Sequence, residues 1–134
     1  MAPVIDTNVL IDLVKGNPSV KNVLEEHSSE SASITVINRY EFLRGIYASI
    51  SRIDRREMLL EFLDQFKVYD FTSKTARVCA EIYSKLRENG LLINELDIII
   101  LSICAENHES IITNDKDFLD AGEISGVKVH FPRS

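Results

Sequence analysis

Hydrophobic residues follow two alternating patterns along the chain. Short β-branched runs predict strands, and longer stretches with an apolar residue every three or four positions predict helices. The expected strands span 3–5, 32–36, 67–71, 110–113 and 127–131; the expected helices span 8–15, 37–50, 53–66, 73–89 and 94–107, with another beginning at Asn17 and Pro18. Strands separated by helices pair in parallel and are covered on both faces. The pattern predicts an α/β fold, a three-layer α/β/α sandwich with a central, mostly parallel sheet of four to five strands.

Length, composition and charge fit a globular protein. The 134 residues suit a single domain over 1–134, and 45% hydrophobic with 27% charged residues exclude disordered, collagen-like and disulfide-based classes. No apolar run approaches the ~20 residues of a membrane span, and the first residues lack a signal-peptide pattern, so we expect a cytoplasmic protein without membrane contact. The net charge of −6 argues against nucleic-acid binding by overall charge, but it leaves local contacts and metal ions open.

Cysteine and arginine positions add little chemistry by themselves. Cys79 and Cys104 show no metal-binding spacing, and we expect both to be small buried apolar side chains. Five arginines fall within eighteen residues, interleaved with acids, at 39, 44, 52, 55 and 56. A solvated helix face explains this cluster most simply. The alternative is that the cluster holds phosphates, with Arg39 and Arg44 as candidate substrate contacts.

Five acidic residues fall at points that a parallel sheet brings together. Asp6 directly follows the first expected strand, and Asp115 and Asp117 follow the fourth. Glu41 lies about one turn into the helix after the second strand, and Asp97 lies near the start of the helix at 94–107. Ligands of open parallel sheets bind at the carboxyl ends of the strands. The sequence therefore predicts that these acids converge at one edge of the sheet.

Each of these acids also has an ordinary structural explanation. Asp6 can act at the N-terminus of the first helix, where the helix dipole favours a negative charge. Glu41 can pair with Arg44 three positions later. Asp97 can complete a helix cap that begins at Asn94. The structural and the functional interpretations both stay open at this point.

Neighbouring polar residues can extend the same set. Asp115 and Asp117 can instead be turn and cap residues, and Asp12 is expected on the exposed face of the first helix. Asn8 and Thr113 are neutral, so a functional role for them would be hydrogen bonding to a carboxylate or to a metal-bound water. Their structural alternatives are capping and turn formation.

Several carboxylates in one place repel each other unless a cation offsets their charge. A site with carboxylates and without histidine or cysteine suits Mg²⁺ or Mn²⁺ better than zinc. Such an ion can activate water and stabilise negative charge on a phosphate. The residues therefore indicate metal-dependent phosphodiester hydrolysis.

The segment VIDTNVLI at 4–11 resembles the opening strand and turn of PIN-domain ribonucleases, and is most similar to their VapC toxin branch. Three further segments match in the family's order: SITVINRYEFLRG at 33–45 with Glu41, LDIII at 96–100 with Asp97, and TNDKDF at 113–118 with Asp115. Together they cover nearly the whole chain. The family often carries Pro and Asn where this chain has LLINEL at 91–96, which leaves the local turn and any role of Glu95 open.

The resemblance implies a PIN-like domain that cleaves RNA endonucleolytically at a Mg²⁺ or Mn²⁺ site and leaves a 5′-phosphate and a 3′-hydroxyl. It implies a homodimer, inhibited by a VapB-like antitoxin that inserts a segment near the active site. By position it assigns catalytic roles to Asp6, Glu41, Asp97 and Asp115, metal binding to Asp6, Asp97 and Asp115, and supporting roles to Asn8, Thr113 and Asp117, with Asp117 a possible substitute for Asp115.

Other functions that use acids at strand ends fit less well. A phosphatase of the haloacid-dehalogenase type requires a second Asp where this chain has Asn8, and a receiver domain requires an acidic pair where Thr7 follows Asp6. Two alternatives keep the fold: a non-catalytic PIN-like binding module and a housekeeping RNA-processing PIN nuclease.

Overall fold

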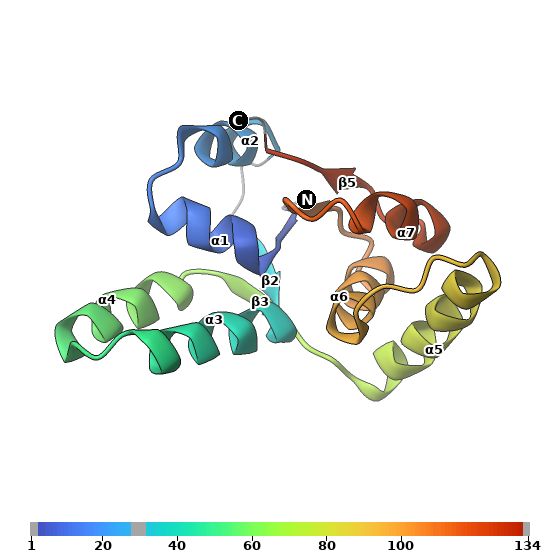
Figure 1. The fold of residues 1–134 in the computed structure, drawn as a ribbon, viewed down its shortest axis with the longest axis horizontal. Helices are drawn as coiled ribbons and strands as arrows, with labels where there is room; N and C mark the ends of the chain where they lie inside the picture. Colours follow the sequence, from blue (N-terminus) through green and yellow to red (C-terminus); the bar gives the residue numbers. More distant parts are fainter. Residues whose placement is uncertain (1–2, 28–31, 133–134) are drawn as a thin grey trace.

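The computed structural model describes residues 3–27 and 32–132, in which a parallel sheet lies between two layers of helices (Figure 1). The sheet has five strands in the order β3-β2-β1-β4-β5, and each neighbouring pair is parallel. The strands are β1 (Val4–Ile5), β2 (Ser33–Thr35), β3 (Lys67–Tyr69), β4 (Ile111–Ile112) and β5 (Val129–His130). The helices are α1 (Thr7–Val14), α2 (Pro18–His27), α3 (Val36–Ser49), α4 (Ile53–Leu63), α5 (Ser73–Glu88), α6 (Glu95–Glu106) and α7 (Phe118–Ser125). The predicted three-layer α/β fold is confirmed.

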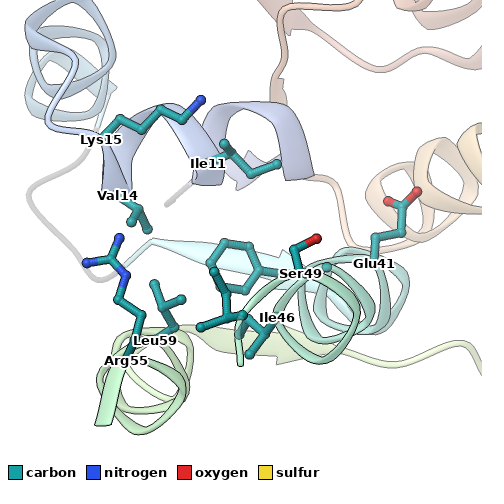
Figure 2. Close-up of a pocket in the computed structure, with 11 residues that line it drawn as sticks. Ile11, Val14, Lys15, Glu41, Ile46, Ser49, Arg55 and Leu59 are labelled. Atoms are coloured by element: carbon teal, nitrogen blue, oxygen red, sulfur yellow. The ribbon is translucent and has the colours of Figure 1, made fainter. Parts of the chain in front are cut away.

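Successive strand residues point to opposite faces of the sheet, and this alternation divides the core in two. Ile5, Ile34 and Ile112 pack in one apolar cluster with side chains of α1, α2, α3 and α4. On the outer side of this layer, α1, α3 and α4 leave an apolar groove of about 440 Å³. Figure 2 shows Val14 of α1 and Leu59 of α4 turned into that groove.

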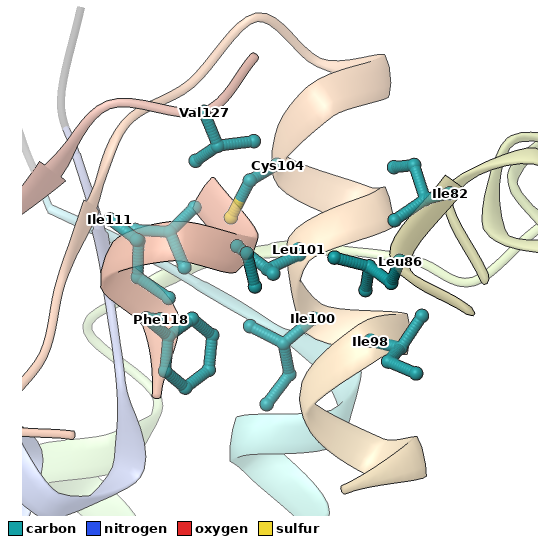
Figure 3. Packing of buried hydrophobic residues seen from close by; sticks show 11 residues of the cluster. Ile82, Leu86, Ile98, Ile100, Leu101, Cys104, Ile111, Phe118 and Val127 are labelled. Carbon is teal, nitrogen blue, oxygen red and sulfur yellow. The ribbon is translucent and has the colours of Figure 1, made fainter. Parts of the chain in front are cut away.

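The opposite face of the sheet carries α5, α6 and α7. Val4 and Ile111 pack there against α6, whose residues 98, 100, 101 and 104 are buried between the sheet and α5 (Figure 3). Burying a side chain of this size contributes about 1.5–3 kcal/mol. The expectation of a buried helix at 94–107 is therefore confirmed. Cys104 is fully buried, as expected, whereas Cys79 is only half-buried.

Element boundaries differ from the sequence-based expectations in two ways. The strands are two or three residues long, shorter than expected, and Val36 opens α3 instead of closing β2. Helix α7 was not predicted, because its buried face includes Ala121 and Gly122, which carry little hydrophobic signal. A Cβ on Gly122 would lie 2.5 Å from Cγ2 of Val129, so the close approach of β5 requires the missing side chain.

None of the helices in the described residues has the length and hydrophobicity of a membrane span.

Candidate active site

The candidate site lies where the order of the strands reverses, at β1. The strands β2 and β3 lie on one side of β1, and β4 and β5 lie on the other. Open parallel sheets have a crevice at such a point, outside the carboxyl ends of the strands. Asp6 follows β1 directly and Thr113 follows β4 directly, so both side chains stand at the crevice.

Asp6 is the buried centre of the site, with 4% of its surface exposed. Its Oδ1 accepts hydrogen bonds from the Thr7 backbone N–H at 2.9 Å and from Asn38 Nδ2 at 3.1 Å. Its Oδ2 accepts the Thr113 hydroxyl at 2.7 Å and, more weakly, Asn8 Nδ2 at 3.4 Å. The predicted hydrogen bonds from Asn8 and Thr113 to a carboxylate are therefore present. The Thr7 bond also caps α1, so the structural role foreseen for Asp6 holds alongside the functional one.

Thr7 and Asn38 belong to this network, and the sequence analysis missed both. The Thr7 hydroxyl donates to Glu41 Oε1 at 2.7 Å and accepts from Asn38 Nδ2 at 3.1 Å. Asn38 is fully buried, and its Oδ1 accepts from the backbone and hydroxyl of Thr35 in the capping box of α3. A signal was available: Asn38 lies four residues before the apolar Phe42, on the face of the helix that must be buried.

The loop after β4 forms the next wall of the site. The Asp115 backbone N–H donates to the Thr113 hydroxyl at 3.0 Å, and Asp115 Oδ1 accepts the Asp117 N–H at 2.9 Å. Asp117 itself is exposed. Asp12 was expected on an open helix face; it is instead half-buried, and its Oδ2 accepts from Asn114 Nδ2 at 2.9 Å. This bond ties α1 to the loop, which explains why amphipathicity alone misplaced Asp12.

Asp97 lies in the first turn of α6, and the charges of the other acids act on its pKa. Burial first, and then the charges of Asp6, Asp115, Glu41 and Asp117 in that order, raise the pKa of Asp97 to about 7 from an ordinary 3.8. The four other acids of the predicted set therefore all lie near enough for their charges to act on Asp97. The alternative role as a helix cap belongs to Asn94, whose Oδ1 accepts the Leu96 N–H at 2.9 Å.

Burial also raises the pKa of Asp6, against the opposing effect of the hydrogen bonds from Thr113 and Thr7. The charges of Glu41 and Asp115 raise it further. Asp6 and Asp97 thus both carry an electrostatic penalty when ionised, as expected for acids gathered without a counter-charge.

The donor set fits a hard divalent cation. Its side chains offer carboxylate oxygens, and no lysine or arginine in the described part of the chain forms an ion pair with these acids. As they stand, no three acidic, histidine or cysteine side chains within residues 3–27 and 32–132 form a closed metal-binding group. The charge of a cation at this site would offset the repulsion that contributes to the raised pKa values of Asp6 and Asp97.

The arginine cluster divides by its partners. Arg39 pairs with Asp64 at 3.2 Å and Arg52 with Asp54 at 2.8 Å. Arg44 does not pair with Glu41; it is exposed and lies over the ring of Tyr40 instead. Of the two candidate substrate contacts, Arg39 is already neutralised and Arg44 is not.

Comparison with known proteins identifies relatives of this arrangement. Residues 4–124 match the family model described as PIN domain. Ribonuclease VapC1 of Methanocaldococcus jannaschii is 28% identical over 126 residues, which are 94% of this chain and 85% of that protein. Ribonuclease VapC2 of Rickettsia felis is 26% identical over 121 residues, covering 88% of this chain and 90% of that protein. The crystal structure of VapBC2 from Rickettsia felis bound to a promoter DNA fragment matches with a TM-score of 0.84 and 22% identity, over 99% of this chain and 100% of the matched chain.

Proposed function

The chain belongs to the PIN domain family, and on that premise we propose that it is a metal-dependent endoribonuclease and the toxin of a VapBC-type pair. The observation that carries the proposal is the hydrogen-bond network at the reversal of strand order, in which Thr7 joins Asp6 to Glu41 and Thr113 joins Asp6 to the backbone of Asp115. The raised pKa of Asp97 supports its inclusion in the same group. The similarity to two proteins named ribonuclease VapC supports RNA as the substrate.

Asp6, Asp97 and Asp115 are the residues proposed to hold the ion, which is Mg²⁺ or Mn²⁺. When bound, the ion activates a water and offsets the charge that develops on the phosphate. Asp6 is the fixed member, since four donors hold its two oxygens. Glu41 orients water through the oxygen that Thr7 does not occupy.

The cleavage is an in-line hydrolysis. Water attacks the scissile phosphorus, the bond from phosphorus to the 3′ oxygen breaks, and the products carry a 5′-phosphate and a 3′-hydroxyl. We assign to Glu41 the role of accepting the proton of the attacking water, and its side chain is only half-buried, so the proton can pass to solvent.

The proposed inhibitor is a VapB-like antitoxin, as in the solved VapBC complexes that share this fold. The groove between α1, α3 and α4 suits an apolar segment of such a partner. Glu41 stands at one end of the groove (Figure 2), so a segment in it can bring a basic side chain to the acids. Such a side chain would neutralise carboxylates that otherwise hold a cation.

The test is cleavage of total cellular RNA by the purified chain, free of any antitoxin, with Mg²⁺ or Mn²⁺ and with EDTA. Glu41→Gln is the sharpest variant, because glutamine keeps an acceptor for the Thr7 hydroxyl and removes only the charge. Asp6→Asn is the second variant, and Asp70→Asn, an exposed acid after β3, is the control.

Discrete fragments that require metal, Glu41 and Asp6 would support the proposal, and mapping of their ends would identify the cut. A folded chain that binds Mn²⁺ calorimetrically and cuts none of the RNA would remove the toxin assignment. A chain that neither cuts nor binds metal would be the non-catalytic binding module.

A further inference from the structure

Two tyrosine–arginine pairs lie along the exposed side of α3. Cζ of Arg44 lies 5.1 Å from the centre of the Tyr40 ring, and Cζ of Arg56, from α4, lies 5.3 Å from the centre of the Tyr47 ring. The rings remain 52% and 58% exposed. These four residues are named here the Tyr–Arg stripe.

A third cation lies over a tyrosine ring in the described residues, but that ring differs from those of the stripe. Lys67 lies over Tyr69, but Tyr69 is half-buried and its hydroxyl donates to Glu109 at 2.5 Å. That ring therefore has a structural role. Tyr40 and Tyr47 have no such buried partner in the described part of the chain, and about half of each side chain stays accessible to a ligand.

The position of the stripe continues the acidic site. Arg44 lies three residues after Glu41, which makes the two neighbours on the surface of α3. Tyr47 follows Tyr40 by seven residues, about 10 Å along the helix axis. A strand bound at the acids and running along α3 would pass both rings.

A phosphate backbone needs local cations to bind this chain. The net charge of −6 and the acidic site both repel it. Within the described residues, Arg44 and Arg56 form no ion pair with a carboxylate, in contrast to Arg39 and Arg52. Arg56 is half-buried and donates to the backbone carbonyls of Ile50 and Tyr47, so it holds the end of α3, whereas Arg44 is exposed. The stripe therefore combines one exposed cation without a carboxylate partner, Arg44, with two exposed aromatic rings, the two features that hold unpaired nucleotides.

We propose that the Tyr–Arg stripe binds the single-stranded substrate beside the cleavage site, with Tyr40 and Tyr47 stacking on unpaired bases and Arg44 contacting phosphate. The inference rests on the proposed ribonuclease function. It predicts that the substrate is unpaired on the side of the scissile bond that follows α3.

The test measures binding of a single-stranded RNA oligonucleotide in the Asp6→Asn background without divalent ions, so that the strand stays intact. Tyr40→Leu and Tyr47→Leu should each raise Kd about tenfold, in line with the strength of base–aromatic stacking. Tyr83→Leu, an exposed tyrosine on α5, is the matched control and should leave Kd unchanged.

Two substitutions of Arg44 separate the effect of its charge from that of its planar guanidinium group. Arg44→Gln should weaken binding and flatten its dependence on salt, because one phosphate contact is lost. Arg44→Lys should restore the salt dependence but only part of the affinity, since lysine keeps the charge without the planar group. The chain has no tryptophan and four tyrosines, so a smaller quenching of tyrosine emission by RNA in Tyr40→Leu and Tyr47→Leu than in Tyr83→Leu would report stacking on the stripe.

Three results would overturn the inference. Unchanged Kd in both tyrosine variants, while the parent chain cuts RNA, would refute the stripe and leave the ribonuclease intact. Loss of a dimer in the variants, seen by gel filtration at unchanged RNA affinity, would assign the surface to a second copy of the chain. A parent chain that neither binds nor cuts RNA would remove the stripe and the proposed function together.

Discussion

Asp97→Asn should stabilise the metal-free protein at neutral pH. Burial and four neighbouring acids raise the pKa of Asp97 to about 7, against 3.8 for an ordinary aspartate. Between those two values the folded chain holds a proton that the unfolded chain has released. Stability must therefore fall as pH rises through this interval, and the loss is complete only above the folded pKa. Asparagine resembles the protonated carboxyl and removes this loss.

The magnitude follows from the same two numbers. At ~1.4 kcal/mol for each pH unit between the unfolded and the folded pKa, the ceiling is ~4 kcal/mol. Asp97 is only partly buried, and water and salt screen a carboxylate in that position, so we expect about 1–2 kcal/mol. At pH 8 the variant should exceed the parent by this amount, and at pH 4 the difference should vanish.

Urea unfolding at several pH values in EDTA, followed by circular dichroism, measures the effect. Asp6 and Asp97 interact through their charges, so the difference between the two proteins also includes the relief that Asp97→Asn gives to Asp6. Asp70→Asn, at an exposed position, controls for removing one charge from an acidic chain and should show a smaller and nearly pH-independent change. A difference between Asp97→Asn and the parent that is the same at pH 4 and pH 8 would refute the electrostatic reasoning.

Further predictions use the same unfolding assay and its thermal equivalent. Added Mg²⁺ should raise the midpoint of the parent protein at pH 8 more than at pH 5, because the ion competes with protons for the acids; equal shifts would argue against binding at the acids. Thr113→Val should cost about 1.5–3 kcal/mol at pH 8 and less at pH 5, since buried Asp6 loses its shortest hydrogen bond when ionised; a variant as stable as the parent at pH 8 would show that this bond is dispensable. Gly122→Ala should cost about 1–3 kcal/mol, because its Cβ would meet Val129. Gly45→Ala, mid-helix with nothing within 4 Å of its Cβ, should instead gain about 0.5–1 kcal/mol; the same sign for both would contradict the packing argument.

The sequence predicted the parallel α/β fold because short β-branched runs alternate along it with longer stretches of helical periodicity. It could not fix the strand ends. In strands of two or three residues, the run of apolar side chains continues into the neighbouring loop or helix, as at Val36. The ladder of hydrogen bonds, which ends a strand, has no counterpart in hydrophobicity.

The closeness of Asp6 and Asp115 could be predicted from the parallel topology. Topology alone brings the ends of β1 and β4 together, so Asp6 and Asp115 required only the assignment of two strands. Placing Asp12 required more. Its contact with Asn114 depends on the path of the loop after β4, and loop paths follow from backbone hydrogen bonds that the sequence pattern does not encode.

The two acids with raised pKa values differ in a way that suggests separate tasks. Asp6 accepts four hydrogen bonds, which fix both oxygens and oppose the effect of burial. Asp97 has no such donor among the described residues, and every contribution to its pKa is unfavourable to the charge. Asp6 is therefore preorganised whether or not a cation is present, whereas a cation would favour the charged form of Asp97, which its surroundings oppose. Because Asn38 and Thr7 supply that preorganisation to Asp6 and Glu41 together, the neutral residues that the sequence analysis missed are those that make the two acids one unit.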